Sequence, residues 1–131
     1  MNLIEYNYFL EPKFVFFEKP FPLFLGSSGY KTSKNSFIFS LKNEHIPPFK
    51  APVYRNGDYA IYNSNNFGPH FGGGNDLHIS SNANSNTNSH DNLGGTYEPP
   101  SGYAYNQRNT QELLAGSRYF TPSEIEVFYL H

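Results

Sequence analysis

The side chains best suited to chemistry lie between residues 70 and 91, where histidines and aspartates gather. They are His70, Asp76, His78, His90 and Asp91. A catalytic zinc ion takes three histidines, or two histidines and a carboxylate, and activates water for hydrolysis. Asp76 and His78 are two residues apart, so they would share one face of a strand. No spacing brings His70 or His90 to that face. We therefore expect ordinary strand and loop histidines, and a metal-dependent hydrolase that uses His78 and Asp76 is the alternative.

A glycine triplet, Gly72-Gly73-Gly74, precedes Asp76 and invites comparison with loops that cradle phosphate groups. Known phosphate loops run from a glycine turn into a helix, or place a lysine directly after the glycines. Here the triplet leads into a predicted strand, and no lysine follows it. We predict a structural role, in which glycine supplies a positive φ angle or lets two stretches of backbone approach closely.

Other catalytic arrangements find no support in the sequence. The absence of cysteine excludes thiolate catalysis and disulfide bonds, and no serine stands in a Gly-x-Ser-x-Gly elbow. Glu124 and Glu126 would lie on one face of a single strand, whereas the carboxylates of glycosidases flank a substrate from separate elements. We expect no catalytic centre, no metal and no cofactor.

The composition narrows the classes of partner. Only 15% of the 131 residues are charged and the formal net charge is −2, which does not favour a nucleic acid or an anionic membrane surface. No apolar stretch approaches the roughly 20 residues of a membrane-spanning helix. Aromatic residues make up 18% of the chain, as is typical of a folded domain. We predict a cytoplasmic domain that neither binds nucleic acid nor inserts into a membrane.

The elements that must position these residues are short strands. Alternation of apolar residues predicts strands at residues 37–41, 77–79 and 125–128, which share one core. The side chains expected to be buried in that core are Phe37, Phe39, Leu77, Ile79, Ile125 and Val127.

Between the strands, the sequence predicts loops and one short helix. The helix is expected over residues 109–114 and ends at Gly116. The asparagine- and serine-rich run over residues 82–89 favours turns and is predicted as a loop. Tyr97, Tyr103 and Tyr105 lie in a loop-rich part of the chain, where tyrosine could supply contact area for a protein partner or cover the domain's own core.

The order of several short motifs resembles that of the TLDc domain of the oxidation-resistance family, over residues 29–129. These motifs are Phe37-Ile38-Phe39-Ser40-Leu41, Ala60-Ile61-Tyr62, the segment from Gly68 through the glycine triplet to Leu77, Asn92-Leu93-Gly94, Leu114-Ala115-Gly116-Ser117 and Glu124-Ile125-Glu126-Val127-Phe128. The motif positions predicted to be structural are Gly68, Gly72, Gly73, Gly74, Asp76, Asn92, Gly94, Gly116, Glu124 and Glu126.

The resemblance implies a β-rich fold of the α+β class, an antiparallel β-sandwich with a few short flanking helices. It implies a non-enzymatic protein-interaction module linked to protection against oxidative stress and to the vacuolar proton-pumping ATPase. Residues 1–28 do not resemble the family, so we expect a divergent N-terminal segment followed by the C-terminal part of the domain over residues 29–131. A sandwich of that kind would be incomplete on its N-terminal side, and an inactive fragment is the remaining alternative.

Overall fold

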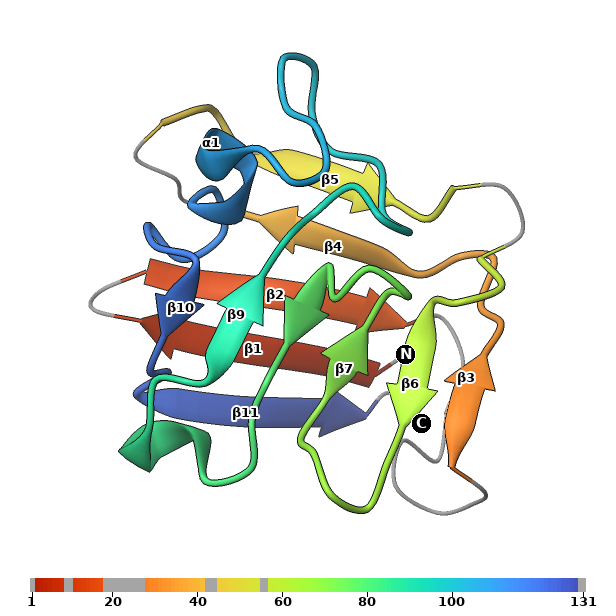
Figure 1. Cartoon of the computed structure of the whole chain (residues 1–131), viewed down its shortest axis with the longest axis vertical. Coiled ribbons are helices and arrows are strands. Elements are labelled where there is room, and N and C mark those ends of the chain that lie inside the picture. The colour runs from red at the N-terminus through yellow and green to blue at the C-terminus, as the bar shows by residue number, and fades with distance from the viewer. Residues whose placement is uncertain (1, 9–10, 18–27, 42–44, 55–56, 130–131) are drawn as a thin grey trace.

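The computed structural model describes residues 2–8, 11–17, 28–41, 45–54 and 57–129. Strands β1, β2 and β11 are described by their backbone pairing. The described strands form two antiparallel sheets, and Figure 1 shows the strands of one sheet running across those of the other. The five-stranded sheet has the order β11 (Glu124–Tyr129), β1 (Asn2–Tyr8), β2 (Glu11–Phe17), β4 (Phe37–Ser40) and β5 (Phe49–Pro52). The six-stranded sheet has the order β10 (Tyr119–Phe120), β9 (Ser89–Asp91), β8 (Leu77–His78), β7 (His70–Phe71), β6 (Ile61–Asn63) and β3 (Gly29–Lys31).

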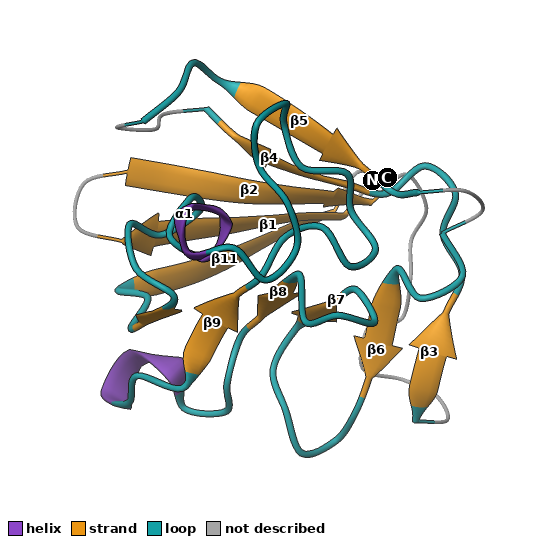
Figure 2. Ribbon diagram, turned by 45° about the horizontal axis from the view of Figure 1, so that its top comes forward, coloured by secondary structure: helices purple, strands orange, loops and turns teal. Residues whose placement is uncertain are grey.

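The two sheets lie one above the other (Figure 2), and the hydrophobic core draws on both. Ile38 and Ala51 come from the five-stranded sheet, while Ile61, Phe71 and Leu77 come from the six-stranded one, and all five are buried. Burying one large apolar side chain contributes about 1.5–3 kcal/mol, which makes this shared layer the main source of stability. The prediction of a β-rich fold is confirmed.

The strand predicted at residues 37–41 is present, but the prediction of its buried face is wrong. Ile38 and Ser40 are 1% and 0% exposed, whereas Phe37 and Phe39 are only partly buried and lie on the other face. Ile38 pairs with Ala51 on β5, and this small partner leaves room for the branched side chain in the core. Alternation fixes which residues share a face but does not say which face is inside.

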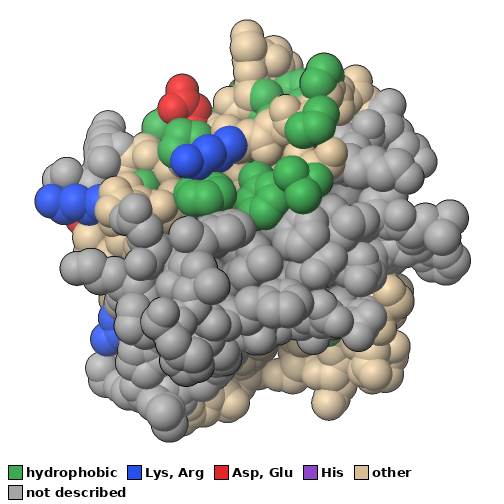
Figure 3. Space-filling view, turned by 180° about the vertical axis from the view of Figure 1, so that it is seen from behind, with side chains coloured by type: hydrophobic (Ala, Val, Ile, Leu, Met, Phe, Trp, Pro, Cys, Tyr) green, Lys and Arg blue, Asp and Glu red, His purple; other side chains and the backbone are tan. Residues whose placement is uncertain are grey.

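Phe37 and Phe39 contact each other on the outer face, with their ring centroids 5.9 Å apart. The Nζ atom of Lys50 lies 4.0 Å from the Phe37 centroid, in cation–π contact with the ring. Together with other side chains they line an apolar hollow of about 420 Å³, formed by Phe37, Phe39, Leu41, Pro48, Phe49 and Lys50. Figure 3 shows hydrophobic and basic side chains side by side on the back of the molecule.

The strands predicted near residue 77 and residue 125 are both confirmed. Leu77 and Ile79 are buried as expected, yet Asp76, His78 and Ser80 are buried too, so both faces of this segment are covered. The predicted strand over residues 125–128 lies within β11. The structure describes the backbone of β11 but not its side chains, so the predicted burial of Ile125 and Val127 lies outside that description.

The N-terminal strands belong to the five-stranded sheet. β1 lies between β11 and β2, and β2 in turn pairs with β4. Residues 2–8 and 11–17 therefore take central positions in a sheet whose other strands come from residues 37–52 and 124–129. The boundary expected at residue 28 falls within a structure to which both sides contribute.

Two segments expected between the strands are shorter or more ordered than predicted. The helix α1 spans only Arg108–Gln111, and the chain then turns through the buried Leu113, Leu114 and Ala115. The asparagine-rich run holds a 3₁₀ turn, Ala83–Ser85, and its last residue begins β9. No helix in the described ranges is long and apolar enough to span a lipid bilayer.

Candidate functional site

Asp76 connects two glycine-containing loops, residues 72–74 and residues 94–95. Its carboxylate is fully buried and accepts hydrogen bonds from the backbone N–H groups of Gly94, Gly95, Thr96 and Tyr97, at 2.9–3.0 Å. All four N–H groups lie within hydrogen-bond distance of Oδ2, and the Thr96 N–H also reaches Oδ1. Burial raises the pKa of the Asp76 carboxyl group, while the backbone hydrogen bonds oppose that rise.

This arrangement is a correction to the metal-site alternative for Asp76 and His78. The Asp76 oxygens face the backbone of residues 94–97, whereas the His78 ring stacks with the histidines of neighbouring strands. The two side chains therefore contact different parts of the molecule. No group of three or more metal-binding side chains converges in the described residues.

Glycine lets the two loops meet at backbone distance. A Cβ atom on Gly95 would lie 2.8 Å from the Cα of Gly74, and one on Gly72 would overlap the Asp76 carboxylate. Gly72 also has a φ of +85°, which side chains other than glycine rarely adopt. The glycine triplet thus packs against residues 94–97 and does not enclose an open anion site.

The other motif positions lie around the same junction or at turns. A Cβ on Gly68 would lie 2.7 Å from the carbonyl oxygen of Ile79, and one on Gly94 would lie 2.8 Å from the backbone nitrogen of Tyr105. Asn92 donates from Nδ2 to Oδ1 of Asn106 at 2.8 Å. Gly116 turns the chain after α1 with a φ of +80°. Glu124 and Glu126 lie on β11, and their side chains are outside the description.

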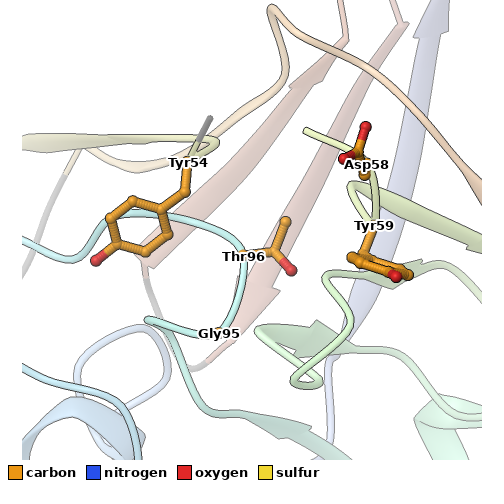
Figure 4. Close-up of a pocket in the computed structure, with 5 residues that line it drawn as sticks. All are labelled: Tyr54, Asp58, Tyr59, Gly95 and Thr96. Carbon is orange, nitrogen blue, oxygen red and sulfur yellow. The ribbon is translucent and has the colours of Figure 1, made fainter. Parts of the chain in front are cut away.

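A pocket of about 460 Å³ opens where these loops meet residues 54–59 (Figure 4). The described residues that line it are Tyr54, Asp58, Tyr59, Gly95 and Thr96. Gly95 and Thr96 belong to the segment that Asp76 holds. Figure 4 shows the Tyr54 and Tyr59 side chains on opposite sides of Thr96. Arg55 and Asn56 lie outside the described residues.

The pocket walls are held by hydrogen bonds and aromatic contacts. The Tyr54 N–H donates to the Thr96 carbonyl at 2.8 Å, and the Gly73 N–H donates to Thr96 Oγ1 at 2.9 Å. The Tyr59 ring meets that of Tyr30 edge to face, with centroids 5.1 Å apart. Tyr59 is nevertheless 58% exposed and Tyr54 39% exposed. The pocket thus presents aromatic surface on a braced backbone.

The charges described at this pocket are negative. Asp58 lines it, and the pKa of the Tyr54 phenol is raised, first by burial and then by the nearby carboxylates of Glu98 and Asp76. The described lining residues include no lysine or arginine. Aromatic rings beside carboxylates suit a cationic group better than an anionic one.

The three tyrosines proposed from the sequence have different surroundings. Tyr97 is fully buried and its hydroxyl donates to the Ala60 carbonyl at 2.9 Å, so it cannot offer contact area to a partner, and this is a correction. Tyr103 is partly buried. Tyr105 is 42% exposed and its hydroxyl donates to the carbonyl of Gly74 at 3.4 Å. Tyr54 and Tyr59 were not predicted as binding residues. The sequence signal that lies between them is the turn motif Asn56-Gly57-Asp58.

A row of histidines crosses the six-stranded sheet. His70 on β7 pairs with His78 on β8, which pairs with His90 on β9. The ring centroids of neighbours are 5.0 and 4.9 Å apart, and Tyr62 and Tyr119 continue the row at its two ends. The expectation that nothing brings His70 and His90 to the face of His78 is wrong, because the antiparallel register of β7, β8 and β9 does so.

The imidazoles of His70 and His78 also share a hydrogen bond. Their Nδ1 atoms are 3.1 Å apart, so one ring donates Nδ1–H to the bare Nδ1 of the other. Burial lowers the pKa of His78 to about 4, with further contributions from His70 and His90. Burial also lowers the pKa of His70. At neutral pH both rings of this pair are therefore uncharged.

Comparison with known proteins identifies one family. The family model for the TLDc domain matches residues 15–131. No curated protein and no solved structure matches the chain.

Proposed function

Because the chain belongs to the TLDc domain family, we propose that it is a non-enzymatic module that acts by binding a protein partner. The observation that carries this proposal is the pocket between Tyr54 and Tyr59, where exposed aromatic rings sit on a backbone that the Asp76 carboxylate holds. Interfaces concentrate their binding energy in aromatic anchors whose positions are fixed before the partner arrives.

The pocket supports binding better than catalysis. Tyrosine supplies large contact area while losing little side-chain entropy, and Tyr59 is further braced by Tyr30. A nucleophile with an adjacent base, which acyl or glycosyl transfer would need, is not found among the described lining residues. The negative charge of Asp58 and Glu98 favours a partner that presents a lysine or arginine side chain.

The family resemblance supplies the first partner to test. It implies the vacuolar proton-pumping ATPase, encountered in the cytoplasm, and through it a part in protection against oxidative stress. A basic side chain on an ATPase subunit would meet the pocket's charge, and Tyr105 beside Gly74 adds exposed area next to the glycine loops.

The test is affinity purification of the intact chain from a cytosolic extract, followed by mass spectrometry. Three baits are compared: the parent, Tyr59→Ala and Tyr119→Ala. Tyr119 is 53% exposed but lies on β10, at the end of the histidine row, so its variant controls for the loss of any exposed tyrosine. We expect ATPase subunits with the parent and with Tyr119→Ala, and a loss with Tyr59→Ala.

Two outcomes would contradict the proposal. Recovery of no ATPase subunits by the folded parent would remove this partner. Equal recovery by the parent and Tyr59→Ala would remove the pocket as the binding surface.

A further inference from the structure

Outside the pocket, His70 and His78 bring two metal-binding side chains into direct contact. They come from adjacent antiparallel strands, in register, and their Nδ1 atoms are 3.1 Å apart. We propose that these two imidazoles form a binding site for one divalent d-block cation, Cu²⁺ or Zn²⁺, held between the two Nδ1 atoms.

The separation of the two nitrogens suits a shared ion. Bonds from imidazole nitrogen to zinc are about 2.0–2.1 Å, so two nitrogens on a tetrahedral ion lie about 3.3 Å apart. On a square-planar ion such as Cu²⁺, neighbouring nitrogens with bonds of similar length lie about 2.9 Å apart. The observed 3.1 Å falls between these values. A cation could therefore take the place of the hydrogen bond at the observed nitrogen separation, once each ring turns so that its Nδ1 lone pair points at the ion and not at the other nitrogen.

The protonation state of the pair also favours a metal. Metal ligands must be unprotonated at the coordinating nitrogen, and one of the two Nδ1 atoms already carries no proton, because it accepts the hydrogen bond from the other. The single proton between the two Nδ1 atoms moves to Nε2 of its own ring when the ion binds. Binding then changes one tautomer and releases no net proton, which distinguishes this pair from exposed, partly protonated histidines.

The donor set indicates the class of ion. Imidazole nitrogen suits copper, zinc and nickel, whereas magnesium and calcium prefer oxygen ligands. The third ring of the row, His90, stacks on His78, but its own Nδ1 is hydrogen-bonded to the carbonyl of Asn88 at 2.9 Å. Two protein ligands leave the remaining positions to water, so this is a binding site and not the three-ligand hydrolase centre considered above.

The experiment is calorimetric titration of the untagged chain with Cu²⁺ and Zn²⁺ at pH 7.5, in two buffers of different ionisation enthalpy. We expect one ion per chain and the same observed enthalpy in both buffers, since no net proton is released. Electron paramagnetic resonance of the Cu²⁺ complex should show nitrogen ligands. His78→Phe and His70→Phe keep an aromatic ring in the row and should each weaken binding by about tenfold or more.

His90→Phe and His45→Ala are the matched controls and should bind like the parent. His70 is less buried than His78, so His70→Phe remains informative if His78→Phe does not fold, as judged by circular dichroism. Absence of binding by the folded parent, or parent-like binding by a folded His70→Phe, would overturn the proposal.

Discussion

Asp76 and the glycines around it make the candidate site at the scale of single residues. The carboxylate has little to do with chemistry on a substrate, because its oxygens are occupied by backbone N–H groups of residues 94–97. Its contribution is positional, since the same N–H groups belong to the segment that lines the pocket. Two pairs of substitutions distinguish this positional role of Asp76 and Gly72 from the general effect of losing a charge or a glycine.

Asp76→Asn is expected to lower the free energy of unfolding by about 2–4 kcal/mol, because an amide NH₂ would then face backbone N–H donors and leave buried groups unpaired. Urea denaturation followed by circular dichroism measures this change. Asp58→Asn removes the same charge from the exposed pocket rim and should change stability by about 0.5 kcal/mol or less. Equal effects of the two substitutions would mean that the backbone network does not hold the loops.

Gly72→Ala and Gly102→Ala form a matched pair, since the two glycines have φ angles of +85° and +89°. Nothing lies within 4 Å of a Cβ on Gly102, whereas a Cβ on Gly72 overlaps the Asp76 carboxylate. We expect Gly102→Ala to cost about 1 kcal/mol from backbone strain alone. Gly72→Ala should cost about 1–3 kcal/mol more from overpacking. Thermal melts of both variants measure the difference, and melts that coincide would contradict a close loop junction.

At the scale of elements, the positions of the strands were easier to predict than which of their faces is buried. Period-two alternation located residues 37–41 and 125–128, because the alternation of a strand can be recognised within a few consecutive residues. It could not decide that Ile38 would face inward in place of Phe37 and Phe39, since that depends on the partner strand. β9 was missed because Ser89 ends an asparagine-rich run with turn chemistry, and its pairing with β8 and β10 makes it a strand.

The histidine row could not be predicted for the same reason. The spacing of His70, His78 and His90 carries no period, and the three rings meet only because β7, β8 and β9 are neighbours in a fixed register. Likewise, Tyr54 and Tyr59 become pocket walls only when residues 94–97 come between them. The family motifs can be read from the order of residues in the sequence, whereas the histidine row and the pocket form only when distant segments pair or pack in the fold.

The histidine row should make stability depend on pH. The ordinary pKa of histidine is 6.5, and burial lowers that of His78 to about 4. Below pH 6.5, His78 binds a proton in the unfolded chain but stays unprotonated in the folded chain. The free energy of unfolding therefore falls as the pH drops from about 6.5 to about 4. Below about pH 4 this contribution no longer changes. Allowing for partial exposure to solvent, the loss at pH 5 should be about 1–2 kcal/mol.

Chemical denaturation at pH 7.0, 6.0 and 5.0 measures this dependence. The groups that face His78 in the row are His70 and His90, and Tyr62, Tyr119 and Arg118 follow at its ends. His78→Phe should therefore flatten the dependence. A slope that persists in His78→Phe would assign the effect to other groups.

At the scale of the whole molecule, the two ends of the chain meet in one sheet. Six residues of β1, from Asn2 to Asn7, pair with Glu124 to Tyr129 of β11. The family match begins at residue 15, inside β2, so β1 extends the sheet beyond the matched segment. Its place between β11 and β2 makes it a structural member of the fold and not an appended tail.

Deletion of residues 2–10 is accordingly expected to abolish cooperative unfolding, because β11 and β2 would both lose their partner and present open edges. A thermal melt and size-exclusion chromatography test this, and we expect a broad transition and self-association. A sharp, parent-like melt of the shorter chain would show that β1 is dispensable.

The pairing of β1 with β11 also constrains how the protein can be made. β1 leaves the ribosome before the other described strands, but the neighbour that completes one side of β1 is synthesised after all of them. Contacts between residues so far apart in sequence form slowly, because a long loop must close before they gain anything. During translation, the edge of β1 that will pair with β11 therefore keeps unpaired backbone N–H and C=O groups. Such exposed strand edges bind chaperones or lead to aggregation. Joining residue 131 to residue 1 through a short linker and opening the chain at an exposed loop would place β11 directly before β1, so that this pair could form as a local hairpin.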